Sequence, residues 1–144
     1  MAAYYIYLIS SLPMLSFGAR PPFSAGEFLR RCQGLIPDRE TRIIAAILNG
    51  DQPVAGQILL LRQWYAFDTS LRNELAIVRA SRKKMDAHRY VRGAHTQDAY
   101  LATVATAAVR NPAIFEAEKT LDFTRWQAIE EFVKGHYFDL EVLV

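Results

Sequence analysis

The side chains that most often carry chemistry in proteins are few in this chain and are spread along it. The histidines are His88, His95 and His136. His88 and His95 are seven residues apart, so they would share one face if this stretch were helical. No further ligand of a suitable type stands near them except Asp86 and Asp98, and histidines in an exposed loop are the simpler interpretation. We therefore expect exposed loop histidines and no bound metal.

The other candidate nucleophiles and acid–base groups lack the neighbours that catalysis requires. Cys32 is the one cysteine, and it lies in an apolar helical pattern that would turn it toward a core. A single cysteine leaves no internal disulfide and fits a reducing, cytoplasmic compartment. The acidic residues of the last third alternate with basic ones, as on solvated helix faces with local ion pairs. They are Glu116, Glu118, Asp122, Glu130 and Glu131.

The sequence contains no motif typical of cofactor binding or nucleophilic catalysis. The seven glycines stand singly, and none belongs to a phosphate-binding loop. Ser10, Ser11 and Ser70 lack a nucleophile motif around them. We expect no catalytic residue and no cofactor, so the chain is predicted not to be an enzyme.

One stretch of the chain carries a marked excess of basic residues. Six basic residues fall between Arg79 and Arg92, with Asp86 as the one acidic residue among them. The candidate partner-binding residues are Arg79, Arg82, Lys83, Arg89 and Arg92. They would dock an acidic protein surface or contact a phosphate backbone. The alternative is a solvated helix end whose cations favour the negative end of the helix dipole.

Composition favours a protein partner over nucleic acid or a membrane. The formal net charge is only +2, from 17 basic and 15 acidic residues, and no nucleic-acid-binding motif is present. The apolar run at the start is shorter than the ~20 residues of a membrane span and lacks the basic residues of a signal peptide. We expect neither nucleic-acid binding nor direct membrane insertion.

Apolar spacing predicts one long helix over about 54–84. Its apolar residues recur at intervals of four, three, four, four and three: Leu60, Trp64, Phe67, Leu71, Leu75 and Val78. These intervals form a helical stripe close to a coiled-coil seam. A helix of ~30 residues would be ~45 Å long at the usual rise per residue. Such a rod would work mechanically, by spacing partners or transmitting force.

Shorter helices are predicted on both sides of this rod. Ser24 and Glu27 form a capping box before a helix over 25–32, with Phe23 and Phe28 as a hydrophobic staple. The other predicted helices are 38–48, capped by Asp38, then 97–110, capped by Thr96, and a last one that ends at Gly135. The predicted fold is a single all-α domain over 1–144, a helical bundle with one long central helix and short flanking helices.

The two ends of the chain leave alternatives open. Tyr4–Ile9 fits a short strand as well as the start of a helix. Pro13–Phe23 contains three prolines and is expected to be a loop. Phe138–Val144 begins a new apolar segment without a C-terminal cap. We expect either that this tail docks on the domain or, in preference, that the chain is truncated relative to a longer protein.

Four segments carry a resemblance to a known family. They are Tyr4–Pro13, Arg20–Ser24 with Glu27–Leu29 and Cys32, Trp64–Ala80, and Phe138–Leu143. The tyrosine-rich start before Ser-Leu-Pro and the Pro-Pro-Phe-Ser cap are the most specific parts. Together the segments resemble an uncharacterised bacterial family encoded alongside the subunits of V/A-type ATPases. Members of that family continue past the last of these segments into a further helix. This chain differs from them because it stops at Val144.

The resemblance implies a non-catalytic accessory or central-stalk-like subunit that works through protein–protein contacts. Its nearest analogue would be the all-helical component that seats the rotor shaft on the membrane ring of the archaeal-type enzyme. The implied partners are other ATPase components, and the implied location is cytoplasmic and peripheral at the inner membrane through the complex. Two alternatives stay open: a helical adaptor or assembly factor unrelated to rotation, and a basic-patch helical module that binds nucleic acid.

Overall fold

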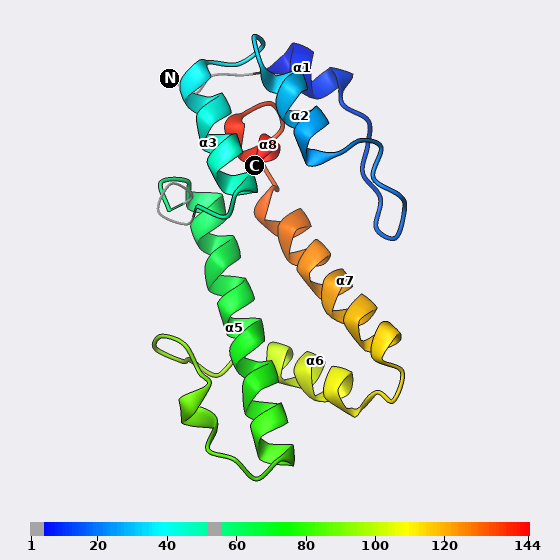
Figure 1. Cartoon of the computed structure of the whole chain (residues 1–144), viewed down its shortest axis with the longest axis vertical. Helices are drawn as coiled ribbons and strands as arrows, with labels where there is room; N and C mark the ends of the chain where they lie inside the picture. Colours follow the sequence, from blue (N-terminus) through cyan, green and yellow to red (C-terminus); the bar gives the residue numbers. More distant parts are fainter. Residues whose placement is uncertain (1–4, 52–55) are drawn as a thin grey trace. The chain divides into compact units, whose positions relative to one another are not determined.

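The computed structural model describes residues 5–51 and 56–144, and the regular structure of these residues is helical (Figure 1). The helices are α1 (Ile6–Ser11), α2 (Ala25–Cys32), α3 (Asp38–Leu48), α5 (Leu59–Arg82), the 3-10 turn η1 (Ala87–Arg89), α6 (Ala99–Arg110), α7 (Ile114–Phe132) and α8 (Leu140–Leu143). The described residues form no strand, and Gln33 and Ile36 make an isolated bridge. The predicted all-α fold class is confirmed.

Contacts along the chain divide it into two compact units. Unit 1 comprises Met1–Arg62 and Glu131–Val144, and unit 2 comprises Gln63–Glu130. Since α5 and α7 each run across a boundary, both units contain part of each of these helices. The expectation of a single domain over 1–144 stays a prediction.

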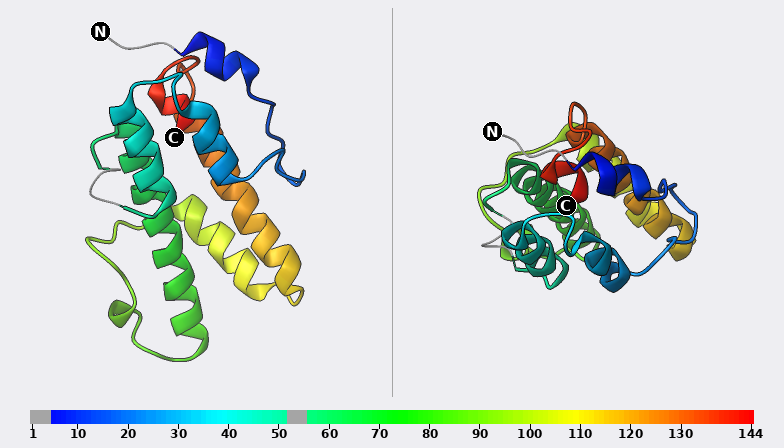
Figure 2. Two further views of the ribbon diagram at one scale, coloured as in Figure 1. Left: turned by 45° about the horizontal axis from the view of Figure 1, so that its top comes forward. Right: turned by 90° about the horizontal axis from the view of Figure 1, so that it is seen from above.

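The core of unit 1 joins segments that are far apart in the sequence. Its buried residues are Tyr5, Leu8, Cys32, Ile36, Ile44 and Leu143. They bring α8 against α1, α2 and α3, as two views of the chain show (Figures 1 and 2). The Tyr5 backbone N–H also donates to the Phe138 carbonyl at 2.6 Å. The C-terminal tail therefore docks on unit 1, one of the two alternatives that the sequence leaves open.

The N-terminal segment of unit 1 is helical from Ile6 to Ser11, so the strand alternative is wrong for these residues. Tyr4 lies outside the described residues. Leu8 is buried in the core, whereas Tyr7 is exposed, as expected of a short amphipathic helix at a surface. Tertiary contacts decide between helix and strand here, because so short an apolar run fits both.

Of the two hydrogen bonds of the predicted capping box, the start of α2 has one. Ser24 Oγ accepts a hydrogen bond from the Glu27 N–H at 3.1 Å. The Glu27 carboxylate does not reach back to Ser24, because it pairs with Arg30 at 2.6 Å and with Arg31 at 3.4 Å. Hydrogen bonds between two charged groups are stronger than a bond to a neutral backbone N–H, so this half of the predicted box is wrong.

Two other predicted features of α2, the aromatic staple and the burial of Cys32, are confirmed. Phe23 and Phe28 stack with their ring centroids 6.4 Å apart, which is the predicted hydrophobic staple. Cys32 is fully buried at the end of the helix. Gly34 follows it with φ +79°, a left-handed conformation that glycine adopts at low cost.

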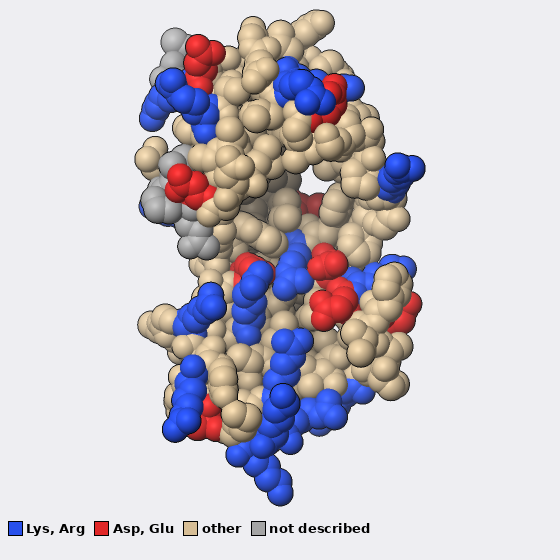
Figure 3. Space-filling model, viewed as in Figure 1, with Lys and Arg blue, Asp and Glu red and all other residues tan. Residues whose placement is uncertain are grey.

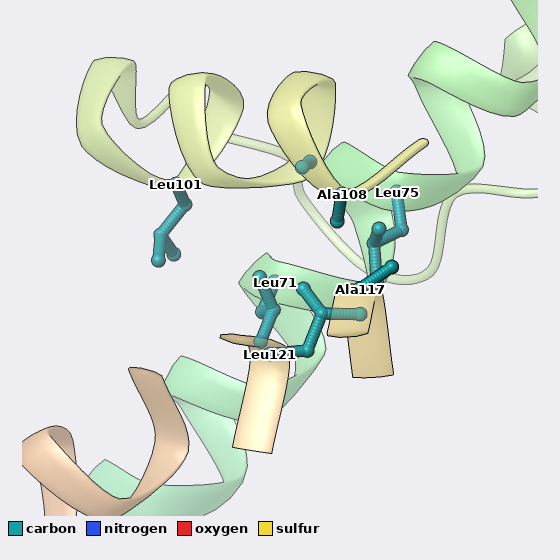
Figure 4. Packing of buried hydrophobic residues seen from close by; sticks show 7 residues of the cluster. Leu71, Leu75, Leu101, Ala108, Ala117 and Leu121 are labelled. Carbon is teal, nitrogen blue, oxygen red and sulfur yellow. The ribbon is translucent and has the colours of Figure 1, made fainter. Parts of the chain in front are cut away.

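The core of unit 2 is built from leucine and alanine on three helices (Figure 4). Its buried residues are Leu71, Leu75, Leu101, Ala105, Ala108, Ala117 and Leu121. Ala105 is completely buried, so its neighbours pack directly against the backbone of α6. Small side chains at such positions allow helices to approach closely at normal packing density.

The long helix is present but shorter than predicted. α5 has 24 residues, which corresponds to about 36 Å of rise. Residues 56–58 form a turn before it, Lys84 with φ 53° follows it, and residues 54–55 lie outside the described residues. Along the predicted stripe, Leu60, Leu71 and Leu75 are buried and the other three are partly buried. The apolar periodicity therefore identifies the buried face correctly.

The starts of α3 and α6 differ from the prediction by one and two residues. Pro37 occupies the N-cap of α3, and Asp38 is the first helical residue rather than the cap. Asp98, not Thr96, caps α6, because its carboxylate accepts the Leu101 N–H at 3.0 Å. No side chain caps α3, whereas at the start of α6 two acceptor side chains stand close together and the sequence alone does not rank them.

Candidate functional site: a basic hollow beside the long helix

One face of α5 and the irregular segment 85–98 enclose a hollow in unit 2. Positions 69, 72, 76 and 79 follow at intervals of three or four and so lie along one face of the helix. The hollow has a volume of about 270 Å³ and is lined by Thr69, Arg72, Asn73, Leu75, Ala76, Arg79, Tyr90 and Arg92. We call it the basic hollow. Three of its eight lining residues are arginines, so an anionic ligand is the natural occupant.

A buried side-chain amide on α5 holds the irregular segment in place beside the basic hollow. Asn73 lies on α5 and is only 4% exposed. Its Nδ2 donates to the Arg92 carbonyl and its Oδ1 accepts from the Arg92 N–H, both at 2.9 Å. These two bonds satisfy the backbone of Arg92 much as a neighbouring strand would. The irregular segment therefore keeps a fixed distance from α5 at this point.

A buried carboxylate fixes the next part of the same segment. Glu74 is 3% exposed, and its Oε1 lies 3.3 Å from His95 Nε2. The same oxygen accepts the Asp98 N–H at 3.4 Å. A carboxylate is costly to bury unless its oxygens have partners, so these contacts account for its position. Together, Asn73 and Glu74 attach three points of the segment to the helix.

The charges in the basic hollow are only partly compensated. Arg72 pairs with Asp68 at 2.7 Å, and Asp68 is shared with Arg125 at 3.0 Å. Within the described residues, neither the Arg79 nor the Arg92 guanidinium group has a hydrogen-bond or ion-pair partner. Figure 3 shows basic side chains gathered around the C-terminal end of α5. Two guanidinium groups are thus available to an anionic partner.

The structure places the five predicted partner-binding residues in different surroundings. Arg79 and Arg92 come together in the basic hollow. Arg82 donates to the Val109 carbonyl at 2.6 Å and so links α5 to the end of α6. Lys83 is exposed just beyond α5, and Arg89 is exposed on η1, and neither lines the basic hollow.

The sequence prediction misses six of the eight residues that line the basic hollow, among them Arg72 and Asn73. Arg72 precedes Arg79 by two helical turns, a spacing that would place both on one face. Asn73 and Glu74 stand side by side between the buried residues Leu71 and Leu75. Polar residues inside an apolar stripe are the available signal, but the identity of their partners depends on the tertiary fold.

Comparisons with known proteins find no match. This holds for protein families, for curated proteins and for solved structures. In addition, none of the helices in the described part of the chain has both the length and the apolar character needed to cross a membrane. The function inferred for the basic hollow therefore depends on its geometry and charge alone.

The remaining reactive groups lie elsewhere. Burial raises the pKa of the Cys32 thiol, which disfavours the nucleophilic thiolate. His88 and His95 do not share a helical face, because η1 ends at Arg89. In unit 1, by contrast, His136, Asp139 and Glu141 bring ligand atoms within 4.8 Å of one another. These three are the residues of the described chain whose arrangement could hold a metal ion.

Proposed function

We propose that this chain is a non-catalytic helical subunit that docks an acidic protein surface through the basic hollow. The observation that carries the proposal is the pair of uncompensated guanidinium groups of Arg79 and Arg92 on either side of the hollow. A guanidinium group binds carboxylates through two parallel hydrogen bonds, so two of them can recognise a pair of acidic side chains.

The attachment of segment 85–98 supports this proposal. An unattached loop would lose conformational entropy when it bound a partner, and that loss would weaken binding. Asn73 and Glu74 order the segment before any partner arrives. The apolar floor supplied by Leu75 and Ala76 would receive an aliphatic group of the partner. Such an arrangement suits an acidic segment that also carries apolar side chains.

We further propose that the partner is a component of a V/A-type ATPase. The support is the resemblance of four sequence segments to a family encoded with those enzymes. In that setting the chain would be an accessory or central-stalk-like subunit, cytoplasmic and peripheral at the inner membrane through the complex. An adaptor or assembly factor unrelated to rotation would use the same surface, and the identity of the partner separates the two functions.

The test is affinity purification of the full-length protein from gently solubilised membranes of cells that produce it. The wild type is compared with the double variant Arg79→Glu/Arg92→Glu. The matched control is Arg39→Glu/Arg42→Glu, which reverses two exposed arginines of α3 in unit 1. We expect ATPase subunits to co-purify with the wild type and with the control. They should be lost with the Arg79→Glu/Arg92→Glu variant, called the hollow variant.

Each contrary result addresses one part of the proposal. Recovery of other proteins without ATPase subunits would contradict the proposed setting. Equal recovery by the wild type and the hollow variant would contradict the proposed surface. Recovery of nucleic acid that falls steeply with salt would support the nucleic-acid alternative.

A further inference from the structure

A second group of side chains capable of binding a ligand lies in unit 1, from the turn after α7 to the start of α8. His136, Asp139 and Glu141 place a ring nitrogen and two carboxylate oxygens within 4.8 Å of one another. His136 Nδ1 is 2.6 Å from Asp139 Oδ2. All three side chains are partly buried. A left-handed turn at Gly135, with φ +87°, precedes the group and directs the chain into α8.

The fold adds a fourth ligand-type residue from a distant part of the sequence. Tyr5 connects the two regions, since its backbone N–H donates to Phe138 O at 2.6 Å and its hydroxyl donates to the Glu40 carboxylate. Glu40 therefore lies beside the turn that carries Glu141.

The charge of this group is balanced only in part, because the pairing of His136 with Asp139 leaves Glu40 and Glu141 without a basic partner among the described residues. Two carboxylates and one imidazole lie together, and among the described residues no lysine or arginine pairs with Glu40, Asp139 or Glu141. Carboxylates that are partly withdrawn from water repel one another unless a cation or a proton lies between them. A metal cation would relieve this repulsion.

We propose that His136, Asp139 and Glu141 form a binding site for a divalent transition-metal ion of the zinc type, with Glu40 adding negative charge beside it. Ligand atoms about 2.1 Å from one ion are at most about 4.2 Å apart, so a small rotation of the long Glu141 side chain closes the set. Water completes the coordination. Zn²⁺ accepts imidazole and carboxylate ligands, whereas Ca²⁺ and Mg²⁺ prefer six or more oxygens.

An ion at this place would attach the tail to the rest of unit 1. The hydrogen bond between His136 and Asp139 would open as the ion replaced the proton between them. Because the unfolded chain does not hold the ligands together, binding would stabilise the native state. The role inferred for the ion is structural.

The experiment titrates metal-free, full-length protein with ZnCl₂ and follows heat and the thermal unfolding midpoint. One equivalent is expected to bind and to raise the midpoint. His136→Gln and Glu141→Gln are expected to weaken binding by about tenfold or more. Both variants leave the Asp139 cap of α8 in place. The matched controls His88→Gln and Glu131→Gln, at exposed positions, should bind like the wild type.

A measurement on the wild type keeps the test independent of variant folding. Adding Zn²⁺ should shift the backbone amide resonances of residues 136–142 and of Glu40. Shifts centred on His88 or His95 would overturn the proposal. Absence of stoichiometric binding, or equal binding by wild type and His136→Gln, would also overturn it. Neither result bears on the basic hollow, which lies in unit 2.

Discussion

The two units bury apolar surface in different ways. The core of unit 1 gathers side chains from α1, α2, α3 and α8, which come from the two ends of the chain. The core of unit 2 uses leucine and alanine on α5, α6 and α7. A core of distant segments fixes chain ends and loops, whereas a core of closely packed helices provides a firm support for whatever is attached to its surface.

The units also differ in how they use polar groups. Unit 1 contains seven basic and seven acidic residues, and unit 2 contains ten basic and eight acidic residues, so the whole net charge of +2 belongs to unit 2. Unit 2 in addition buries Asn73 and Glu74 to hold segment 85–98. Unit 1 instead brings His136, Asp139 and Glu141 together in its C-terminal tail. The proposed anion-binding surface thus belongs to unit 2 and the proposed cation site to unit 1.

The largest effect is expected from truncating the helical core of unit 2. Leu71 is completely buried, so Leu71→Ala should lower the free energy of unfolding by about 2–5 kcal/mol. Denaturant titration followed by circular dichroism measures it. Leu59→Ala, at an exposed position of the same helix, should change it by less than about 0.5 kcal/mol. Equal effects of the two variants would show that this face of α5 is not the packed one.

Asn73→Ala should have the next largest effect. The change leaves the Arg92 N–H and carbonyl without their partner, and a lost buried hydrogen bond costs about 1–3 kcal/mol. Hydrogen exchange at the Arg92 amide should accelerate. Gln97→Ala, at an exposed position of the same segment, is the control and should leave that exchange rate unchanged. Slow exchange at Arg92 in the Asn73 variant would contradict the attachment of the segment.

Ser24→Ala tests the cap of α2 in unit 1. Loss of the Ser24 acceptor should lower the free energy of unfolding by about 1 kcal/mol. The loop variant Ser16→Ala, which removes a hydroxyl without a capping role, should be nearly neutral. A neutral Ser24 variant would mean that the Phe23–Phe28 contact alone sets the start of the helix.

The smallest effect concerns the pH dependence contributed by Glu27. The hydrogen bond from Arg30 is the main cause that lowers the pKa of this carboxyl in the folded protein. The pair therefore stabilises the fold fully above the ordinary pKa of glutamate, and this contribution is lost as the pH falls through the lowered value. An NMR titration should give a midpoint below the ordinary value, and Arg30→Gln should raise it. An unchanged midpoint in that variant would exclude the pairing in solution.

Regular periodicity makes part of the fold predictable. The intervals from Leu60 to Val78 identify α5 and its buried face, because a helix repeats every 3.6 residues whatever surrounds it. The predicted Thr96 cap of α6 is wrong, since Thr96 and Asp98 are both good acceptors and only the folded geometry decides which one reaches Leu101. Local rules thus locate elements more reliably than their first residues.

The two candidate sites depend on contacts that the sequence does not reveal. The basic cluster between Arg79 and Arg92 is visible in the sequence, but its division into hollow-lining and structural members depends on Asn73 and Val109. In unit 1 the short spacing of His136, Asp139 and Glu141 is visible in the sequence, but their proximity to Glu40 is not, because Glu40 lies about a hundred residues before Glu141. Pairings over such separations follow from tertiary packing rather than from local pattern.

The most direct test of the proposed docking surface measures how accessible its arginine side chains are in the complex. The purified complex and the free protein would be labelled with phenylglyoxal, which modifies accessible guanidinium groups, and each arginine would be quantified by mass spectrometry. We predict that the partner protects Arg79 and Arg92 and leaves Arg39 and Arg42 as reactive as in the free protein. Unchanged labelling of Arg79 and Arg92 in the complex would contradict the assignment of partner binding to the basic hollow.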